Sequence, residues 1–327
     1  MALRSFARGT SVPRMGGLVI ETSRLERRFG DVHAVRGVDL AVESGEIYGF
    51  LGPNGAGKST VVKMLITLLA PTAGTARVLG HDVVAEADKI RLRIGAALQD
   101  ASLDEKQSGR EILRMQGALY GLTRTETEQR IAELSSLIEV EAIDRWIGTY
   151  SGGMRRRLDL AASLMHNPDL LFLDEPTTGL DPTSRAQVWQ EVRVLNEQLG
   201  TTIFLTTQYL EEADVLADRV GIINAGEIVG EGTPDELKRT VGADVVQIQV
   251  DDQDAGVAAL ESLDMVDHVE RGPRALLVSV TDGAAAVSPI AIALDAAGVA
   301  VGELTLRTPT LDDVFLELTG DRIEVAE

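Results

Sequence analysis

Residues 52–60 of the chain read Gly52-Pro53-Asn54-Gly55-Ala56-Gly57-Lys58-Ser59-Thr60. This run fits the pattern G-x-x-x-x-G-K-[ST], in which glycines let the backbone amides curl around an anion. A short apolar strand, Ile47–Leu51, precedes it, and a helix is expected from Lys58 to about Leu69. The N-terminus of that helix adds a partial positive charge. The order strand, loop, helix predicts a phosphate site, with Lys58 on the β- and γ-phosphates and Ser59 on Mg²⁺.

A carboxylate pair at the end of a second apolar strand complements this loop. The residues are Leu170-Leu171-Phe172-Leu173-Asp174-Glu175. Asp174 ends the strand, where its carboxylate is expected beside the phosphate loop as part of the Mg²⁺ shell. Glu175 follows one residue later, where it can orient or deprotonate an attacking water. Alone the motif also fits an acidic turn after a buried strand; paired with the loop it indicates a nucleoside triphosphatase.

A third motif lies between them, at Tyr150-Ser151-Gly152-Gly153-Met154. Ser151 is a good N-cap, so the helix that follows offers a second anion site at its N-terminus. Two anion sites for one nucleotide predict a head-to-tail pair of subunits, in which the Ser151-Gly152-Gly153 segment of each closes on the γ-phosphate held by the other. An ordinary capped helix is the simpler interpretation.

The composition narrows the class of protein. The chain has 327 residues, 44% of them apolar, with a formal net charge of −20 and no cysteine. A large core is therefore possible, while a disulfide framework, a thiolate metal site and a cysteine nucleophile are excluded. The acidic balance argues against a nucleic-acid partner. No apolar run approaches the roughly 18 residues of a membrane span.

The patterning along the chain predicts an α/β domain with a smaller domain after it. Alternation over 18–45 indicates antiparallel strands, 3.6-residue periodicity over 104–146 indicates helices, and the near-continuous apolar runs predict a sheet covered on both faces. After a break at 233–242 the order is β-α-β-β-α-β, which is ferredoxin-like, and an amphipathic helix follows at Leu311–Leu318. The basic start, 1–17, is expected to be a flexible extension, with weak attraction to an anionic membrane surface as the alternative.

Taken together, these motifs resemble the ATP-binding subunit of ATP-binding cassette transporters, over about residues 18–240. The resemblance implies a P-loop NTPase fold with a mixed sheet core, an antiparallel β subdomain and a helical subdomain at about 100–165. It implies ATP and Mg²⁺ as cofactors, with Gln99 contacting Mg²⁺ or the attacking water. It also implies that Phe29 stacks on adenine and that Asp181, in the loop after Glu175, crosses the dimer interface. A core role for Phe29 is the alternative.

Three details resemble one branch of that family, the daunorubicin/doxorubicin-type drug-resistance exporters. They are Met154 with three following arginines, Gly109-Arg110-Glu111, and Leu311-Asp312-Asp313-Val314-Phe315. This branch implies a separate multi-span membrane subunit, a position on the cytoplasmic face of the membrane and export of hydrophobic drugs, antibiotics or lipids. The three arginines also fit a solvated helix face. The expected domains are 18–243, the ATP-binding domain, and 244–327, an accessory domain.

One departure from the family pattern bears on the mechanism. The family usually has a histidine after the strand that follows the Asp174-Glu175 motif. In this chain Gln208 stands at that position, in Thr207-Gln208-Tyr209. Glutamine donates a hydrogen bond but carries no proton or charge. Our hypothesis is therefore that Gln208 holds the γ-phosphate or the water, while Glu175 remains the base. The alternative function is a soluble, non-transport ATPase of the same cassette type.

Overall fold

The computed structural model describes residues 17–99, 103–137, 142–273 and 275–320. The predicted extension therefore lies outside the described residues, except for Gly17. Two compact units divide the chain between Pro234 and Asp235, and each is described by itself. The predicted domain limits at 243 and 244 stay a prediction. Among the described residues, no helix combines the length and apolarity needed to cross a membrane.

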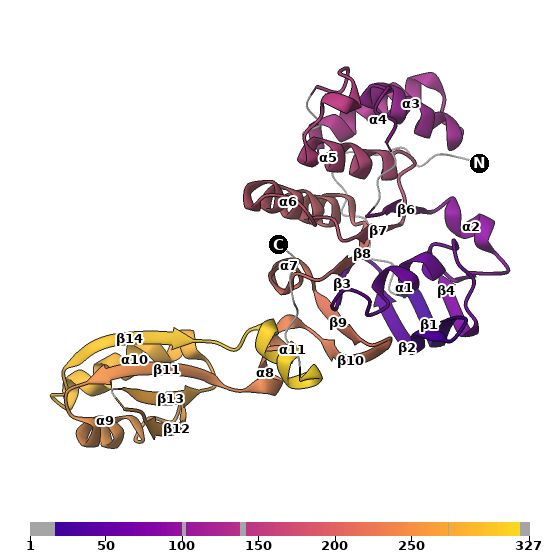
Figure 1. Cartoon of the computed structure of the whole chain (residues 1–327). Coiled ribbons are helices and arrows are strands. Elements are labelled where there is room, and N and C mark those ends of the chain that lie inside the picture. Colours follow the sequence, from indigo (N-terminus) through magenta and orange to yellow (C-terminus); the bar gives the residue numbers. More distant parts are fainter. Residues whose placement is uncertain (1–16, 100–102, 138–141, 274, 321–327) are drawn as a thin grey trace. The chain divides into compact units, whose positions relative to one another are not determined.

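The centre of the first unit is a six-stranded sheet with the order β10-β9-β3-β8-β7-β6 (Figure 1). The strands β9, β3, β8, β7 and β6 are parallel, and β10 at one edge is antiparallel to β9. Their bounds are β3 (Ile47–Leu51), β6 (Ile94–Ala97), β7 (Leu170–Asp174), β8 (Thr202–Thr207), β9 (Arg219–Asn224) and β10 (Glu227–Gly232). The predicted mixed α/β sheet is confirmed.

A second, antiparallel sheet packs against one face of the first through a shared core. Its order is β2-β1-β4-β5, with β1 (Leu18–Phe29), β2 (Val32–Glu43), β4 (Ala73–Val78) and β5 (His81–Asp82). Helix α1 (Lys58–Leu65) lies between the sheets in Figure 1, and α2 (Ala87–Arg91) follows β5. Helix α1 ends before the predicted Leu69, because Thr67 takes a left-handed backbone (φ 67°) and the amides of Leu68 and Leu69 both turn back to the carbonyl of Lys63.

Helices lie on the other side of the central sheet: α3 (Gly109–Leu119), α4 (Arg124–Leu137), the 3-10 turn η1 (Ile147–Thr149), α5 (Gly152–Ser163), α6 (Pro182–Leu199) and α7 (Leu210–Leu216). Of these, α5 packs against β6, and α3 packs against α4 and α5. Alternate strand residues enter separate cores: Phe172 and Phe204 pack with α1 and the antiparallel sheet, whereas Leu171 and Ile203 pack with the helices. A sheet buried on both faces explains the near-continuous apolar strands.

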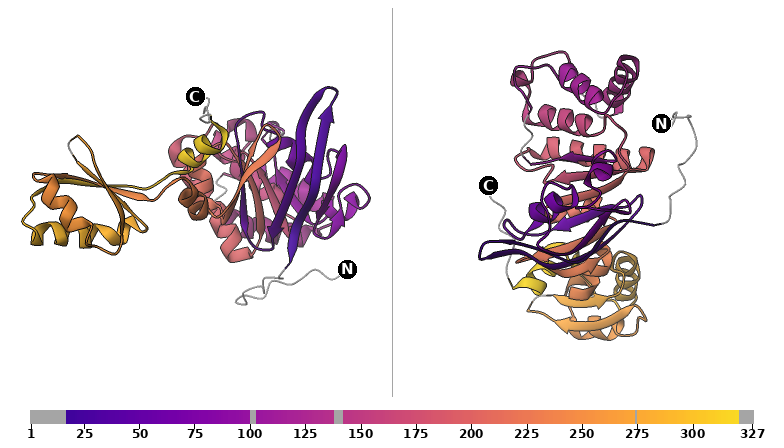
Figure 2. Two further views of the ribbon diagram at one scale, coloured as in Figure 1. Left: turned by 90° about the horizontal axis from the view of Figure 1, so that it is seen from below. Right: turned by 90° about the vertical axis from the view of Figure 1, so that its right-hand side faces the viewer.

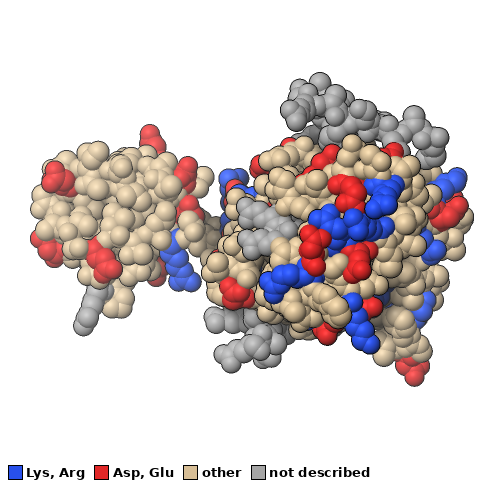
Figure 3. Space-filling view, turned by 90° about the horizontal axis from the view of Figure 1, so that it is seen from above, with Lys and Arg blue, Asp and Glu red and all other residues tan. Residues whose placement is uncertain are grey.

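The charges on the helical part of this unit are largely neutralised locally. The guanidinium of Arg110 bonds both carboxylate oxygens of Asp144, at 2.5 and 3.2 Å, and also contacts Glu128 at 3.0 Å. Arg114 contacts the same Glu128. On the face drawn in Figure 3, basic and acidic side chains are accordingly interleaved over this unit.

The second unit contains the predicted β-α-β-β-α-β order. Its elements are α8 (Pro234–Val241), β11 (Asp244–Val250), α9 (Gln253–Leu260), β12 (Val266–Arg271), β13 (Leu276–Val280), α10 (Gly283–Ala296), β14 (Val301–Arg307) and α11 (Leu311–Thr319). The four strands form an antiparallel sheet of order β12-β13-β11-β14 (Figures 1 and 2). The acidic residues Asp251 and Asp252 accept backbone amides, from Ala300 and at the start of α9, so they serve loop and cap roles.

Candidate active site

The site begins where four neighbouring parallel strands end. Strands β3, β8, β7 and β6 lie in this order, and the carboxyl ends of parallel strands share one edge of a sheet. After β3 comes the phosphate loop, after β8 comes Gln208, after β7 comes Glu175, and after β6 comes Gln99. The topology thus gathers residues that are as far apart in the sequence as Gly52 and Gln208.

The phosphate loop takes its shape from two tight contacts. Gly57 is the N-cap of α1, with φ 110° and no capping side chain. A Cβ on Gly57 would lie 2.7 Å from the carbonyl oxygen of Ala34, and one on Gly52 would lie 2.3 Å from that of Ile223. Because no side chain caps α1, its first amides are free to bind an anion. Of the remaining residues of the predicted set, Pro53, Asn54, Gly55 and Ala56 lie in the same loop, and Thr60 lies in the first turn of α1.

The ammonium group of Lys58 lies inside this loop. It donates to the carbonyl oxygens of Gly52 and Pro53, at 2.7 and 3.0 Å, and lies 3.2 Å from Glu175 Oε1. Only 4% of the residue is exposed. Burial lowers the pKa of Lys58 from its usual value, while the Glu175 carboxylate opposes that shift. The ammonium therefore lies at the loop, in contact with the carboxylate that follows β7.

Ser59 and Asp174 lie together, as predicted for a metal site. The hydroxyl of Ser59 donates to Asp174 Oδ1 at 3.3 Å, and the hydroxyl of Thr206 donates to the same oxygen at 2.5 Å. These are oxygen donors, which Mg²⁺ prefers, and Mg²⁺ at nucleotide sites takes one or two carboxylates together with phosphate oxygens. The donor set therefore fits Mg²⁺. Within the described residues, no group of three or more His, Cys, Asp or Glu side chains could hold a metal by itself.

Glu175 is held in a strained conformation at the end of β7. It takes φ 48°, which is uncommon for a residue with a side chain. Its amide donates to both the carbonyl and the hydroxyl oxygen of Thr206, at 3.1 and 3.0 Å. The hydroxyl of Thr178 donates to its Oε2 at 3.2 Å. These contacts fix the carboxylate beside Lys58.

A cavity of about 600 Å³ opens at this edge of the sheet. The described residues that line it are Asn54, Gln99, Glu175, Thr178, Gly179, Leu180, Asp181, Arg185, Gln208 and Tyr209. Gln99 is exposed after β6. Gln208 is only 3% exposed, and its Oε1 has no hydrogen-bond partner among the described residues. Both glutamines and the candidate base therefore face one space.

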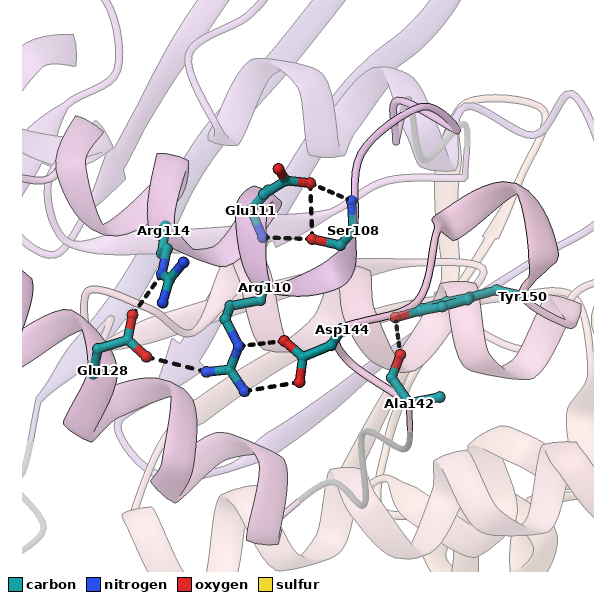
Figure 4. Close-up of polar contacts among 8 residues, drawn as sticks. All are labelled: Ser108, Arg110, Glu111, Arg114, Glu128, Ala142, Asp144 and Tyr150. Carbon is teal, nitrogen blue, oxygen red and sulfur yellow. Dashed lines mark hydrogen bonds and ion pairs between the residues drawn. The ribbon is translucent and has the colours of Figure 1, made fainter.

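The predicted second anion site lies at the start of α5, and its residues are not among those that line the cavity. Ser151 is the N-cap, and its hydroxyl accepts from the amide of Met154 at 3.2 Å. Ser151 and Gly152 are exposed and Gly153 is half-buried. Tyr150, which precedes the cap, donates its hydroxyl to the carbonyl of Ala142 at 2.9 Å (Figure 4). The N-terminus of α5 is therefore exposed, and the residue before its cap, Tyr150, is held in place by its bond to Ala142.

Two other predicted residues have clear positions. Asp181 caps α6: its carboxylate accepts from the amides of Thr183 and Ser184 and from the Ser184 hydroxyl. Phe29 ends β1 with 45% of its surface exposed, and the Arg27 guanidinium lies 4.6 Å from its ring centroid. The alternative core role for Phe29 is therefore wrong. Stacking on adenine and crossing an interface stay predictions.

Arg156 is a residue whose role the sequence reasoning missed. Its guanidinium donates to the carbonyl of Leu98 at 3.0 Å and to that of Asp174 at 3.4 Å, and pairs with Asp159 at 3.2 Å. It thus joins α5 to the segment before Gln99 and to the end of β7. The side chain of Arg156 is only 11% exposed, and that of Arg157, paired with Glu191, only 14%. The solvated-face interpretation is wrong for both, and only for Arg156 was there a local signal, the acid Asp159 at i+3.

The chain is similar to known proteins along its whole length. Residues 35–178 match a family model described as ABC transporter, and residues 232–319 match one described as ATP-binding protein DrrA1-3-like, C-terminal domain. The daunorubicin resistance ATP-binding protein DrrA3 of Streptomyces coeruleorubidus is 48% identical, over 96% of this chain and 99% of that protein. The Nod factor export ATP-binding protein I of Rhizobium sp. (strain N33) is 37% identical, over 95% and 100%.

Solved structures agree with this similarity. A dimer of the ATP-binding cassette MJ0796 in a post-hydrolysis state, bound to ADP and Pi, is 25% identical, with a TM-score of 0.59 over 65% of this chain and 98% of that one. A chain titled ATP binding subunit of ABC transporter is 27% identical, with a TM-score of 0.61 over 68% of this chain and 92% of that one.

Proposed function

The chain belongs to the ATP-binding cassette transporter family, and from that premise we propose that it powers export of a hydrophobic drug, antibiotic or lipid. As a member of this family it binds and hydrolyses ATP and works as the ATPase subunit of a transporter. The identity of the exported compound class is proposed because the relatives with the same accessory domain carry resistance names. The proposed partners are a second copy of the chain and a separate membrane-spanning subunit, which keeps it at the cytoplasmic face of the membrane.

In the proposed reaction, the loop 52–60 holds the phosphates through backbone amides, and Lys58 exchanges its carbonyl contacts for phosphate oxygens. Ser59, Asp174 and Gln99 hold Mg²⁺, which when bound neutralises charge on the β- and γ-phosphates. Phe29 stacks on the adenine. Catalysis of this kind depends on positioning and electrostatics rather than on a covalent intermediate.

Glu175 acts as the base that accepts a proton from the attacking water. The observation that carries this assignment is its carboxylate, which accepts from the Thr178 hydroxyl and lies only 3.2 Å from Lys58 Nζ, on a backbone whose amide is held by Thr206. Gln208, which lines the same cavity, orients the γ-phosphate or the water. In the closed dimer, the amides of Ser151-Gly152-Gly153 from the second copy complete the γ-phosphate site, and Asp181 lies in the loop at the interface.

The test is Glu175→Gln, which keeps the shape of the side chain but removes its basicity. Loss of a general base lowers kcat by about 10² to 10⁴-fold. We expect the variant to bind ATP normally and to accumulate as an ATP-induced dimer in gel filtration. The control is Glu227→Gln, at an exposed site on β10. Unchanged turnover without an ATP-induced dimer refutes the assignment.

A second experiment tests the transport role. Tagged protein is extracted from its own cell membranes in mild detergent, and co-purifying chains are identified. A stoichiometric chain with several membrane spans is the expected result. Recovery of soluble partners alone, from a protein that still hydrolyses ATP, contradicts export and favours a soluble ATPase.

A further inference from the structure

Arg185 is a basic side chain in the active-site cavity that the proposed reaction does not use. It lies in the first turn of α6, and of the described residues that line the cavity it alone is basic. Glu175 and Gln208 line the same space. Because the guanidinium of Arg185 lies in the cavity where the γ-phosphate would react, it can bind a phosphate group.

Among the described residues, no carboxylate forms an ion pair with this cation. Arg185 Nε is buried without a hydrogen-bond acceptor among the described residues. The carboxylate of Asp181, one turn earlier, is engaged by the start of α6. Glu212 is fully buried; burial raises the pKa of its carboxyl, whereas the nearby charge of Arg185 lowers it. The Nε–H of the guanidinium, which has no acceptor among the described residues, is therefore available to another ligand.

Tyr209 holds this guanidinium in place. The Arg185 Cζ lies 4.3 Å from the centroid of the Tyr209 ring, a cation–π arrangement that leaves the N–H edge free. Tyr209 directly follows Gln208, so the same turn after β8 supplies the aromatic support and the amide. Gln208 can both donate and accept a hydrogen bond, and its Oε1 has no partner among the residues described.

We propose that Arg185, supported by Tyr209, binds the inorganic phosphate formed in the reaction and holds it beside Gln208 until it leaves. Hydrolysis transfers the γ-phosphoryl group of ATP to water and yields ADP, HPO₄²⁻ and a proton. The guanidinium fork matches the phosphate oxygens. The remaining O–H of HPO₄²⁻ is a donor, and the free acceptor on Gln208 fits it. This inference rests on the proposed ATP hydrolysis.

The test measures inhibition of the ATPase by two probes, inorganic phosphate and orthovanadate, for the full-length protein. Arg185→Gln is expected to raise the half-inhibitory concentration of each probe by about tenfold or more, since a lost charged hydrogen bond is worth at least that factor. The Kd for ADP is expected to stay unchanged. Arg185→Lys keeps the charge and is expected to restore part of the inhibition. The matched control is Arg193→Gln, an exposed arginine on the same helix.

Tyr209→Asp gives a second, independent reading. An aspartate there offers Arg185 a carboxylate partner, so inhibition by both probes is expected to weaken without removal of the arginine. Tyr209→Phe keeps the ring and is expected to behave as the parent does. Unchanged inhibition in Arg185→Gln, or a parallel fall in ADP affinity, overturns the inference. A parent protein without ATPase activity instead refutes the proposed function itself.

Discussion

The pH dependence of stability has a specific source at His166. This side chain lies after α5, stacked on Tyr120 with ring centroids 3.7 Å apart, and its Nε2 lies 2.9 Å from the carbonyl oxygen of Ile94. Because that oxygen only accepts, Nε2 must carry the proton, and the buried Nδ1 has no partner among the described residues. Burial lowers the pKa of His166 from 6.5 to about 4, and Arg130 adds to the shift.

The sign and the size of the effect follow from this shift. Between pH 4 and pH 6.5 the unfolded chain binds the proton and the folded chain does not, so stability is complete above pH 6.5 and is lost as the pH falls. Integrating from pH 7.5 to pH 5.0, the free energy of unfolding falls by about 2 kcal/mol from this group alone. Asp159 works in the opposite direction, since burial raises its pKa to about 6. The contribution of His166 therefore has to be measured as a difference between variants.

The assay is urea unfolding at pH 7.5 and pH 5.0, followed by tryptophan fluorescence. Trp146 and Trp189 are the two tryptophans of the chain, and both lie in the first unit, as His166 does. His166→Asn lowers stability at both pH values through lost stacking, but it is expected to remove the 2 kcal/mol of pH dependence worked out above. His268→Asn, at an exposed site, is the control. An equal pH dependence in parent and His166→Asn refutes the reasoning.

Two further predictions concern the active-site edge. Gly57→Ala is expected to destabilise the protein by about 1–3 kcal/mol and to abolish ATP binding, since φ is 110° and a carbonyl of β2 lies 2.7 Å from the new Cβ. Calorimetry and nucleotide titration measure the two effects, and Gly55→Ala, with φ 80° but open space around the new Cβ, is the control. Equal losses of stability and of ATP binding in the two variants contradict the clash. Thr206→Val removes the hydroxyl that orients Asp174, so kcat is expected to fall by about tenfold or more with folding retained. Thr202→Val, at the opposite end of the same strand, loses a bond from the amide of Gly45 and is expected to leave kcat unchanged; steady-state kinetics that rank the two variants equally contradict this role.

The sequence predicted the features that local patterns encode. The phosphate loop before α1, the buried strand ending in Asp174 and the serine cap before α5 each depend on a few consecutive residues, and all three lie where the patterns indicate. Burial of β7 and β8 on both faces of the sheet could be predicted because the apolar residues of each strand form a run without polar interruption. The order of elements in the second unit followed in the same way from periodicity.

Features that depend on distant contacts were not predictable. Arg156 binds the carbonyl oxygen of Leu98, 58 residues earlier in the chain, and that of Asp174, 18 residues later. No local sequence pattern marks such carbonyl acceptors. The same holds for the stacking of Arg185 on Tyr209, which joins α6 to the turn after β8. Residues 142–146 were expected to be helical, yet they form turns to which the side chains of Arg110 and Tyr150 bind. These contacts depend on which distant segments the fold brings together and on where their side chains point, and neither is encoded in a local pattern.

The strand register at the active-site edge has a consequence for how this protein tolerates change. Asp174 is opposite Thr206, and Leu51 is opposite Thr207, in ladders where side chains alternate between the two faces. A single inserted or deleted residue inside β7 or β8 would turn Asp174 or Thr206 to the wrong face and displace the glutamate or glutamine after it. Insertions and deletions inside β7 or β8 are therefore expected to destroy the site, whereas insertions in the surface loops are expected to be tolerated.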